Sequence, residues 1–366
     1  MDLVRALGSA VLTVMLVYFL TPWVKRLALK IGAVDLPNER KVHQGVMPRL
    51  GGFGIYLGFV AVVLLTGNIN REVLGLLLGA TMIMGIGIID DTRGLSPKIK
   101  LLGQISAALI LVAFGIRVDF LTNPLAGMID IGQDGMIGLN KLVIPVTVLW
   151  VVGVTNAVNL IDGLDGLAAG TASVAALTIA VISFFEGQMV EFYLALVLAG
   201  AVMGFLRHNF YPAKIFMGDS GSMFLGFSLS ALAIMGLTKG ATVISLFTPL
   251  VILGIPIMDT LFAILRRFGS RQPIFKADKK HLHHCLLDMG LSHKQTVLVI
   301  YAVNVCLGFS AVMLTRLTTE QSMLMLMAIT VLAILAANKI GILTSGQIEE
   351  KHLGNHGSKD GKYMGM

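Results

Sequence analysis

Stretches of roughly 18–25 mostly apolar residues follow one another along almost the whole chain, and this pattern limits the fold more than any other feature. The mean hydropathy is +0.83, and only 13% of the 366 residues are charged, about half the usual share in a soluble domain. A soluble chain of this size would instead show several amphipathic helices. The sequence therefore predicts an all-α polytopic membrane protein.

The apolar stretches divide into about eleven transmembrane helices. We expect these helices at approximately 3–22, 49–67, 72–90, 99–116, 141–160, 164–185, 190–206, 220–237, 242–265, 294–315 and 320–338. Residues 1–340 are predicted to form a single transmembrane domain, followed by a flexible tail over 341–366. No cleavage-site pattern follows the first stretch, which favours a retained helix over a signal peptide.

The basic residues are distributed unevenly between the two sides of these helices. If the N-terminus lies outside, 22 of the 28 basic residues fall in cytoplasmic loops and in the tail. This asymmetry predicts an N-terminus outside and a C-terminus in the cytoplasm. The net charge of +7 is then a topology signal and does not indicate nucleic-acid binding.

The predicted topology also assigns each long loop to a side. The cytoplasmic loops are 23–48, 91–98, 156–166, 207–222 and 266–293. The Gly-rich segment 117–140 lies outside and is predicted to form a small hairpin.

Ionisable residues inside membrane helices cost about 2.5–3.5 kcal/mol each at a helix centre, so they are candidates for function. The aspartates in or at the ends of the apolar stretches are Asp90, Asp91, Asp162, Asp165, Asp219 and Asp259. The topology places the first five at cytoplasmic helix ends. Asp259 lies about 10 Å deeper, given the helical rise per residue, and is left outside the candidate site.

The first motif is the pair Asp90 and Asp91. Adjacent side chains on a helix point about 100° apart, so the two carboxylates do not both face one ligand. One of them could bind a metal or act as a base while the other pairs with Lys98 or Lys100. The alternative interpretation is a charged helix end that faces water.

The second motif repeats polar residues at intervals of three, from Asn156 and Asn159 to Asp162 and Asp165. A tighter 3₁₀ turn near the neighbouring glycines would place them along one edge. Amide and carboxylate groups in this register suit a nucleotide or a hydrated Mg²⁺. An ordinary capped helix end is the alternative, and it leaves the two asparagines unexplained.

The third motif runs from Asn209 through Phe216 to Asp219, where a short Gly/Ser/Asp turn enters an apolar helix. The free backbone N–H groups at such a helix start attract phosphate, and an aspartate there can hold Mg²⁺. The alternative is that Asp219 is only the N-cap of this helix.

The fourth motif consists of His281, His283 and His284 in the basic loop 266–293. The chain lacks a clean set of further Cys or His ligands for a closed zinc site. Phosphate binding together with nearby Lys and Arg is the favoured interpretation, and a solvated basic loop is the alternative.

Together and in this order, the four motifs resemble those of the bacterial polyprenyl-phosphate N-acetylhexosamine-1-phosphate transferases of glycosyltransferase family 4. The resemblance covers roughly residues 35–293. Arg49 in a Met-Pro-Arg-Leu-Gly-Gly segment, preceded by His43, and the His-Leu-His-His pattern look like the GlcNAc-1-phosphate branch. They differ from the pattern of the phospho-N-acetylmuramoyl-pentapeptide transferases.

The resemblance implies roles for these residues. The implied catalytic residues are Asp90, Asp91, Asp162, His281, His283 and His284. The implied substrate-binding residues are Asn156, Asn159, Asp165, Phe216, Asn209, Lys98, Lys100, Arg49 and His43. The implied metal ligands are Asp219 and Asp162, with Mg²⁺ as cofactor and Mn²⁺ as a substitute. In this pattern Asp90 acts as a base toward the lipid phosphate, and Phe216 stacks on uracil.

The implied reaction transfers GlcNAc-1-phosphate from UDP-GlcNAc to undecaprenyl phosphate and releases UMP. It would initiate a cell-envelope polysaccharide, such as teichoic acid or O-antigen, at the cytoplasmic face of the bacterial inner membrane. The implied partners are a UDP-N-acetylhexosamine, undecaprenyl phosphate and the bilayer, with no nucleic acid, and homodimers are common in the family. One-step and two-step routes both stay open. The alternatives are a phospho-MurNAc-pentapeptide transferase and a transporter of lipid-linked sugars or anions, which the lack of an inverted repeat disfavours.

Overall fold

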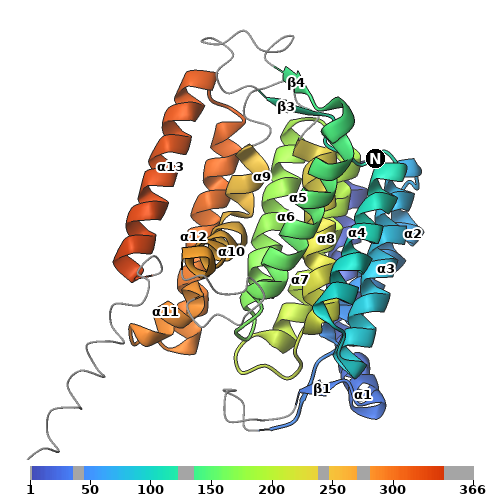
Figure 1. Ribbon diagram of the computed structural model, residues 1–366. Helices are drawn as coiled ribbons and strands as arrows, with labels where there is room; N and C mark the ends of the chain where they lie inside the picture. The colour runs from blue at the N-terminus through green and yellow to red at the C-terminus, as the bar shows by residue number, and fades with distance from the viewer. Residues whose placement is uncertain (1, 36–44, 123–135, 238–246, 270–280, 342–366) are drawn as a thin grey trace, which may run out of the picture.

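The computed structural model describes residues 2–35, 45–122, 136–237, 247–269 and 281–341, and these form a bundle of long helices (Figure 1). The helices are α1 (Leu3–Ile31), α2 (Gly51–Thr66), α3 (Arg71–Arg93), α4 (Pro97–Ala113), α5 (Val143–Leu160), α6 (Leu167–Phe185), α7 (Met189–Asn209), α8 (Gly218–Leu237), α9 (Phe247–Ile252), α10 (Gly254–Gly269), α11 (Leu282–Asp288), α12 (His293–Leu314) and α13 (Thr319–Ile340). A 3₁₀ turn, η1 (Asn140–Leu142), precedes α5.

Two short antiparallel strand pairs lie at the ends of the bundle. They are β1 (Val34–Asp35) with β2 (Met47–Pro48), and β3 (Phe120–Thr122) with β4 (Met136–Gly138). The second pair confirms the hairpin predicted within 117–140, although residues 123–135 lie outside the described part of the chain.

Among the described residues, seven helices are long and apolar enough to cross a membrane, and α2 is a shorter apolar helix. The chain is therefore an all-α, multi-pass membrane protein, as predicted. The number of eleven spans and the orientation of the termini stay predictions, as does the division at residue 340. All eleven predicted stretches nevertheless overlap helices of the structure.

Two predicted boundaries are wrong. The first helix does not end at residue 22 but continues through Pro22 to Ile31, where Gly32 adopts a left-handed conformation with φ 77°. The stretch predicted as one helix over 242–265 contains two described helices, α9 and α10, separated at Leu253. Residues 266–269 and α11 also give helical structure to the loop predicted at 266–293.

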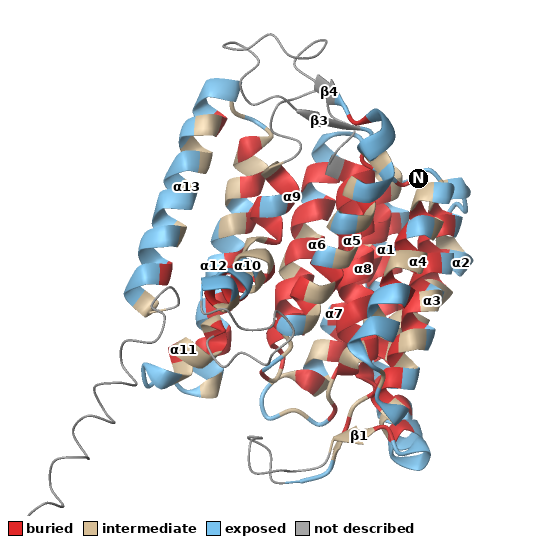
Figure 2. Cartoon of the chain, viewed as in Figure 1, coloured by how far each residue is buried: buried red, intermediate tan, exposed pale blue. Residues whose placement is uncertain are grey.

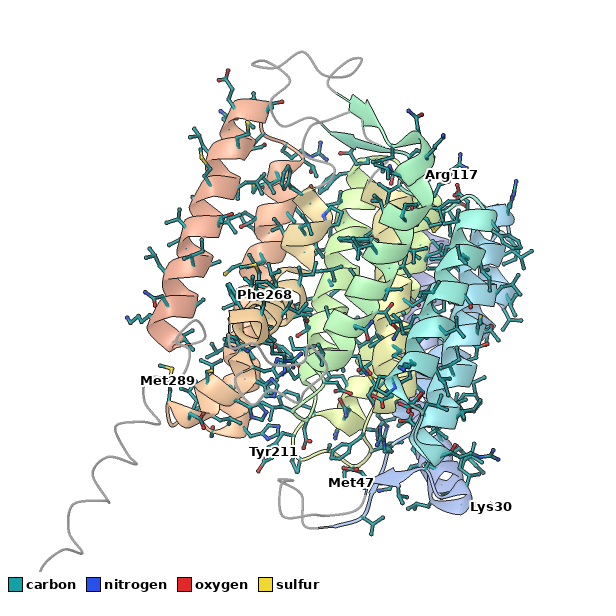
Figure 3. The ribbon with its side chains drawn as sticks, in the orientation of Figure 1. Lys30, Met47, Arg117, Tyr211, Phe268 and Met289 are labelled. Carbon is teal, nitrogen blue, oxygen red and sulfur yellow. The ribbon has the colours of Figure 1, made fainter. Side chains whose placement is uncertain are left out.

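The two ends of the bundle carry different sets of loops. Lys30, Met47, Tyr211 and Met289 lie at one end, which we call the lower end as drawn, and Arg117 lies at the other (Figure 3). Labelled residues of three loops that are predicted to be cytoplasmic, 23–48, 207–222 and 266–293, thus lie at the end opposite Arg117.

The centre of the bundle is formed by α6, α7 and α8, whereas α13 lies at its edge (Figure 2). Within the most apolar window, 78% of the residues of α6 are buried, compared with 6% for α13. The outer helix α13 therefore presents most of its apolar surface to its surroundings, as a lipid-facing helix does.

Close contact between α1 and α7 depends on small residues. A Cβ atom at Gly200 would lie 2.6 Å from the carbonyl oxygen of Ala10, and one at Gly204 would lie 2.5 Å from that of Val14. Small residues allow helix backbones to approach in a membrane, where packing replaces the hydrophobic effect. This contact fixes α7, whose lower end leads into the candidate site.

Candidate functional site

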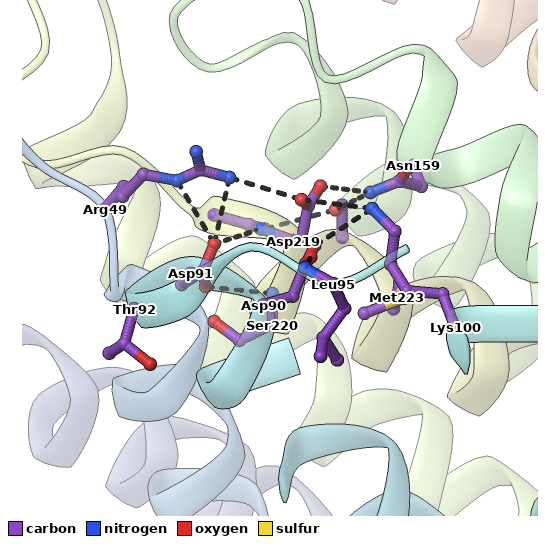
Figure 4. A network of polar contacts seen from close by, with 12 residues as sticks. Arg49, Asp90, Asp91, Thr92, Leu95, Lys100, Asn159, Asp219, Ser220 and Met223 are labelled. Atoms are coloured by element: carbon purple, nitrogen blue, oxygen red, sulfur yellow. Dashed lines mark hydrogen bonds and ion pairs between the residues drawn. The ribbon is translucent and has the colours of Figure 1, made fainter. Parts of the chain in front are cut away.

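A polar network at the lower end joins the end of α3 to the start of α8 (Figure 4). It contains three of the predicted aspartates, Asp90, Asp91 and Asp219, and the two cations Arg49 and Lys100. The sequence predicted that these residues have related roles, and the fold brings them into direct contact.

Asp91 binds the N-terminus of α8. Its side chain has no exposed surface, and its oxygens accept hydrogen bonds from the backbone N–H groups of Asp219 at 2.9 Å and Ser220 at 3.0 Å. A carboxylate satisfies free N–H groups and favours the positive end of the helix dipole. Asp91 thus caps a helix that lies 128 residues further along the chain. A Cβ atom at Gly218 would lie 2.5 Å from Asp91 Oδ2, so this approach requires glycine there.

Arg49 connects two carboxylates of the network. Its Nη2 lies 3.0 Å from Asp91 Oδ1 and 3.2 Å from Asp219 Oδ2, and its Nε donates to Asp91 Oδ1 at 3.1 Å. Burial alone would lower the pKa of Arg49, but the charges of Asp91 and Asp219 outweigh it and hold this pKa above its ordinary value. Arg49 is therefore a fixed positive charge.

The backbone around Arg49 explains its position. The N–H of Phe216 donates to the carbonyl of Pro48 at 2.8 Å, and the N–H of Gly51 donates to the carbonyl of Phe216 at 2.9 Å. A Cβ atom at Gly52 would lie 2.0 Å from Cα of Gly221, so the two segments touch through glycine backbone. The segment after β2 is thereby attached to the residues that enter α8.

Asp90 points to a different partner from Asp91, as predicted from the helix geometry. Its Oδ2 lies 2.9 Å from Lys100 Nζ, and its Oδ1 accepts a hydrogen bond from the N–H of Leu95 at 2.7 Å. Of the two lysines that the sequence offered, Lys100 makes this contact, whereas Lys98 is exposed and outside the network.

Asp219 is the most accessible carboxylate of the three, with a side chain 26% exposed. Its Oδ1 accepts a hydrogen bond from Asn159 Nδ2 at 2.8 Å, and Lys100 Nζ lies 3.6 Å from its Oδ2. The same Asn159 nitrogen lies 2.7 Å from Ser222 Oγ. Asp219 is therefore not the N-cap of α8, because its carboxylate points toward other elements and Asp91 caps the helix.

Asp162 lies in the turn between α5 and α6 and is half-buried. Burial first, and then the charges of Asp219 and Asp91, raise the pKa of Asp162 to about 7. Burial and the neighbouring carboxylates therefore both disfavour the ionised form of Asp162.

The remaining polar residues of the second and third motifs hold the loops together. Asn156 Nδ2 donates to Gln104 Oε1 at 2.7 Å, away from Asp219. Asp165 Oδ2 accepts a hydrogen bond from the N–H of Ala213 at 2.9 Å, and Asn209 Oδ1 accepts one from the N–H of Gly166 at 3.1 Å. The helix α5 ends at Leu160 and a turn follows, so the four polar residues of the ladder do not line one edge.

The histidine motif spans the entry into α11. His281 Nδ1 donates to Asp259 Oδ2 at 2.8 Å, and the N–H of Leu282 donates to Asp259 Oδ1 at 2.8 Å. Asp259, which was predicted to lie outside the candidate site, therefore contacts the histidine motif. Its signal was the cost of a carboxylate within an apolar stretch, which requires a partner.

His283 contacts the turn that carries Asp162. A Cβ atom at Gly163 would lie 2.4 Å from His283 Nε2, so the histidine ring packs against this glycine. Burial, followed by the charge of His284, lowers the pKa of His283 to about 3, and the ring is therefore neutral at pH 7. The ring centres of His283 and His284 lie 4.3 Å apart.

The last two predicted residues are Phe216 and His43. Phe216 is half-buried and bridges to Arg49 through its backbone. His43 lies outside the described residues.

The acidic groups of the site meet the chemical requirement for a hard cation, although they do not form a compact ligand cluster. Within the described part of the chain, no three His, Cys, Asp or Glu side chains are close enough to hold a metal together. However, the ion pairs among the described residues give Asp90, Asp91, Asp162 and Asp219 two neighbouring cations, Arg49 and Lys100. Oxygen ligands with excess negative charge are the kind that Mg²⁺ prefers.

The chain resembles known proteins over nearly its whole length. It is 43% identical over 343 residues to the probable undecaprenyl-phosphate N-acetylglucosaminyl 1-phosphate transferase of Bacillus subtilis (strain 168), covering 93% of this chain and 94% of that protein. The decaprenyl-phosphate N-acetylglucosaminephosphotransferase of Mycolicibacterium smegmatis is 38% identical, with coverage of 93% and 88%. The undecaprenyl-phosphate alpha-N-acetylglucosaminyl 1-phosphate transferase of Haemophilus influenzae is 32% identical, with coverage of 78% and 81%.

The family model of glycosyl transferase family 4 matches residues 73–237, which include Asp90, Asp162 and Asp219. The relatives and the family model agree with the resemblance seen in the four motifs. The chain is a phosphotransferase that belongs to glycosyl transferase family 4, on the branch of the N-acetylglucosaminyl 1-phosphate transferases.

Proposed function

We propose that this protein transfers GlcNAc-1-phosphate from UDP-GlcNAc to undecaprenyl phosphate, with release of UMP. The observation that carries the proposal is the accessible carboxylate of Asp219, held between Arg49 and Lys100 where α3 and α8 meet. The names of the relatives support the lipid phosphate and the sugar phosphate as substrates. The product would initiate a cell-envelope polysaccharide, whose identity is set by later enzymes.

The reaction requires charge neutralisation more than covalent chemistry by the protein. An oxygen of the lipid phosphate attacks the β-phosphorus of UDP-GlcNAc and forms a new P–O bond. The bond from this phosphorus to the oxygen that bridges the two phosphates breaks, and UMP leaves with that oxygen. Arg49 and Lys100 are proposed to attract the diphosphate and the lipid phosphate, since both lie beside Asp219, the proposed metal ligand.

Mg²⁺ is proposed to bind at Asp219 and Asp162, with Mn²⁺ as a substitute. A divalent ion there would neutralise the diphosphate of the sugar nucleotide. Asp219 is accessible, and Asp162 makes no described side-chain hydrogen bond. Full activity in excess chelator would refute this assignment.

Asp90 and Asp91 are proposed to position the cations. Both carboxylates are almost fully buried, and their oxygens already accept hydrogen bonds from backbone N–H groups. The lipid phosphate is largely ionised near neutral pH, so its attack needs a base only for the protonated fraction. These contacts support a positioning role for Asp90 over the role as a base that the family resemblance implied.

The site is proposed to face the cytoplasm, where UDP-sugars are made, with the acceptor phosphate at the level of the inner-leaflet headgroups. Lys30 lies at the lower end, in a predicted loop that is rich in Lys and Arg, and this favours the proposed orientation. Asn159, Phe216 and the histidine motif are proposed to contact the nucleotide and its phosphates. A homodimer stays a proposal from the family resemblance.

The experiment uses purified protein with undecaprenyl phosphate and a panel of UDP-N-acetylhexosamines, including UDP-MurNAc-pentapeptide. We expect UMP release with UDP-GlcNAc and none without the lipid phosphate. The matched variant Asp219→Asn is expected to stay in the membrane in normal amount and to lose transfer. Near-normal turnover by this variant would refute the role of Asp219, and preference for the pentapeptide substrate would move the protein to the other branch.

A further inference from the structure

A cavity of about 520 Å³ lies at the lower end, where the last turns of α7 meet the segment that leads to α8. Its apolar lining consists of Met203, Leu206, Phe210, Tyr211 and Pro212. None of the lining residues belongs to the network of Asp90, Asp91 and Asp219. The cavity is therefore distinct from the candidate site.

Two cations, Arg207 and Lys214, complete the lining, and none of the described residues that line the cavity is acidic. Both residues are exposed. Within the described part of the chain, neither side chain makes an ion pair or a hydrogen bond. A cavity with apolar walls and two cations without protein partners fits an amphiphile that has an anionic head.

The end of the bundle at which the cavity lies carries residues that are typical of a membrane–water interface. Tyr211 lies at the lower end (Figure 3). The neighbouring helix α1 carries an exposed Trp23 at this end, with the guanidinium of Arg26 5.1 Å from its ring centre. His208 Nε2 lies 3.0 Å from the carbonyl oxygen of Tyr18, which connects this part of α7 to α1. Trp, Tyr and basic residues together are typical of a membrane–water interface.

We propose that this cavity binds an anionic phospholipid of the bilayer. The phosphate of the headgroup would contact Arg207 and Lys214. An acyl chain would lie against the apolar lining residues, which include Met203. A bilayer phospholipid fits better than a nucleotide, because the described residues that line the cavity include no carboxylate or amide side chain to read a base. The proposal does not depend on the transfer reaction.

The test measures lipid binding to the purified, delipidated protein in detergent micelles, with phosphatidylglycerol as the probe and native mass spectrometry as the readout. The variant is the double substitution Arg207→Gln with Lys214→Gln. The matched control is Lys30→Gln with Lys294→Gln, which removes the same charge from two exposed lysines outside the cavity. The thermal unfolding of each variant, followed by circular dichroism, shows whether it is folded.

The wild type and the control are expected to bind phosphatidylglycerol with the same Kd, and more tightly than phosphatidylcholine. The double variant is expected to raise this Kd about 25-fold, since each of the two basic residues near an anionic surface contributes about a fivefold gain in affinity. UMP release by the double variant is expected to equal that of the wild type when substrates are saturating. If the wild type releases no UMP, the proposed function fails while the lipid titration still tests the cavity.

Three results would overturn the proposal. A double variant that is folded and binds phosphatidylglycerol like the control would show that the cavity is not the site. Equal binding of phosphatidylcholine would show that the cations do not select the headgroup. Competition by inorganic phosphate alone, or binding of undecaprenyl phosphate but not of phosphatidylglycerol, would assign the cavity to another ligand.

Discussion

The substitution Asp91→Asn tests the assignment of Asp91 as the cap of α8. The carboxylate accepts hydrogen bonds from two backbone N–H groups, those of Asp219 and Ser220, and from the guanidinium of Arg49. An asparagine has one acceptor oxygen, and its NH₂ group would face either the backbone N–H of Ser220 or the donors of Asp219 and Arg49. The variant would therefore lose the ion pair and leave at least one donor without a partner.

The expected cost follows from these contacts. Each hydrogen bond to a charged group contributes about 1.5–3 kcal/mol, and breaking a buried ion pair costs about 3–5 kcal/mol. The Asp91 side chain has no exposed surface, but the Arg49 side chain is 29% exposed and is partly screened by solvent. We expect the free energy of unfolding to fall by about 3 kcal/mol, toward the lower end of this range.

The assay compares the thermal unfolding of wild type, Asp91→Asn and Asp219→Asn in detergent with excess chelator, followed by circular dichroism. Asp219 is 26% exposed and keeps its hydrogen bond from Asn159 as an asparagine, so its substitution is expected to cost less than about 1 kcal/mol. Asp91→Asn should unfold several degrees below both other proteins. If Asp91→Asn unfolds at the temperature of the wild type, the capping assignment is wrong.

Three further predictions concern single contacts. Lys100→Gln is expected to reduce the rate of UMP release at least tenfold, and Lys98→Gln is expected to leave it unchanged, since of these two lysines Lys100 contacts Asp90. Equal rates of UMP release in the two variants would contradict a role for this contact. The pKa of Asp162 is about 7, above that of an unfolded aspartate, so its stabilising contribution is full below pH 4 or so and is lost as the pH rises through 7. Without metal, Asp162→Asn should therefore unfold at a higher temperature than the wild type at pH 8, and this difference in unfolding temperature should disappear near pH 4. A difference that does not depend on pH would refute the raised pKa of Asp162. Asp259→Ala is expected to raise the KM for UDP-GlcNAc and to lower the rate of UMP release while the protein stays in the membrane, because the substitution removes the hydrogen bonds to His281 and to the start of α11. Unchanged kinetics would show that the pair of Asp259 and His281 does not contribute to the site.

The sequence predicted the general fold because the length of an apolar stretch is a local property. It could not predict that α1 passes through Pro22, because this depends on packing against α2 and α7. The break at Leu253 was equally hidden in a continuous apolar stretch. The hairpin at 117–140 was predicted because its Gly-rich composition is also local.

The sequence also predicted that the aspartates gather at one end of the bundle, since each lies at the end of a helix on the same predicted side. It could not assign their partners, which come from distant segments. Arg49 and Asp219 are 170 positions apart, and Asp91 and Ser220 are 129 apart. The pairing of Asp259 with His281 was missed because a depth estimated along one helix does not reveal what a later loop places beside it.

The central claim is tested most directly by the products of one reaction with purified protein, Mg²⁺, UDP-GlcNAc labelled in the β-phosphate, and undecaprenyl phosphate. Transfer of GlcNAc-1-phosphate predicts one unlabelled UMP for each labelled diphospholipid that forms, and no labelled UDP or free phosphate. Labelled UDP as the product, or transfer of sugar without its phosphate, would contradict the proposed function.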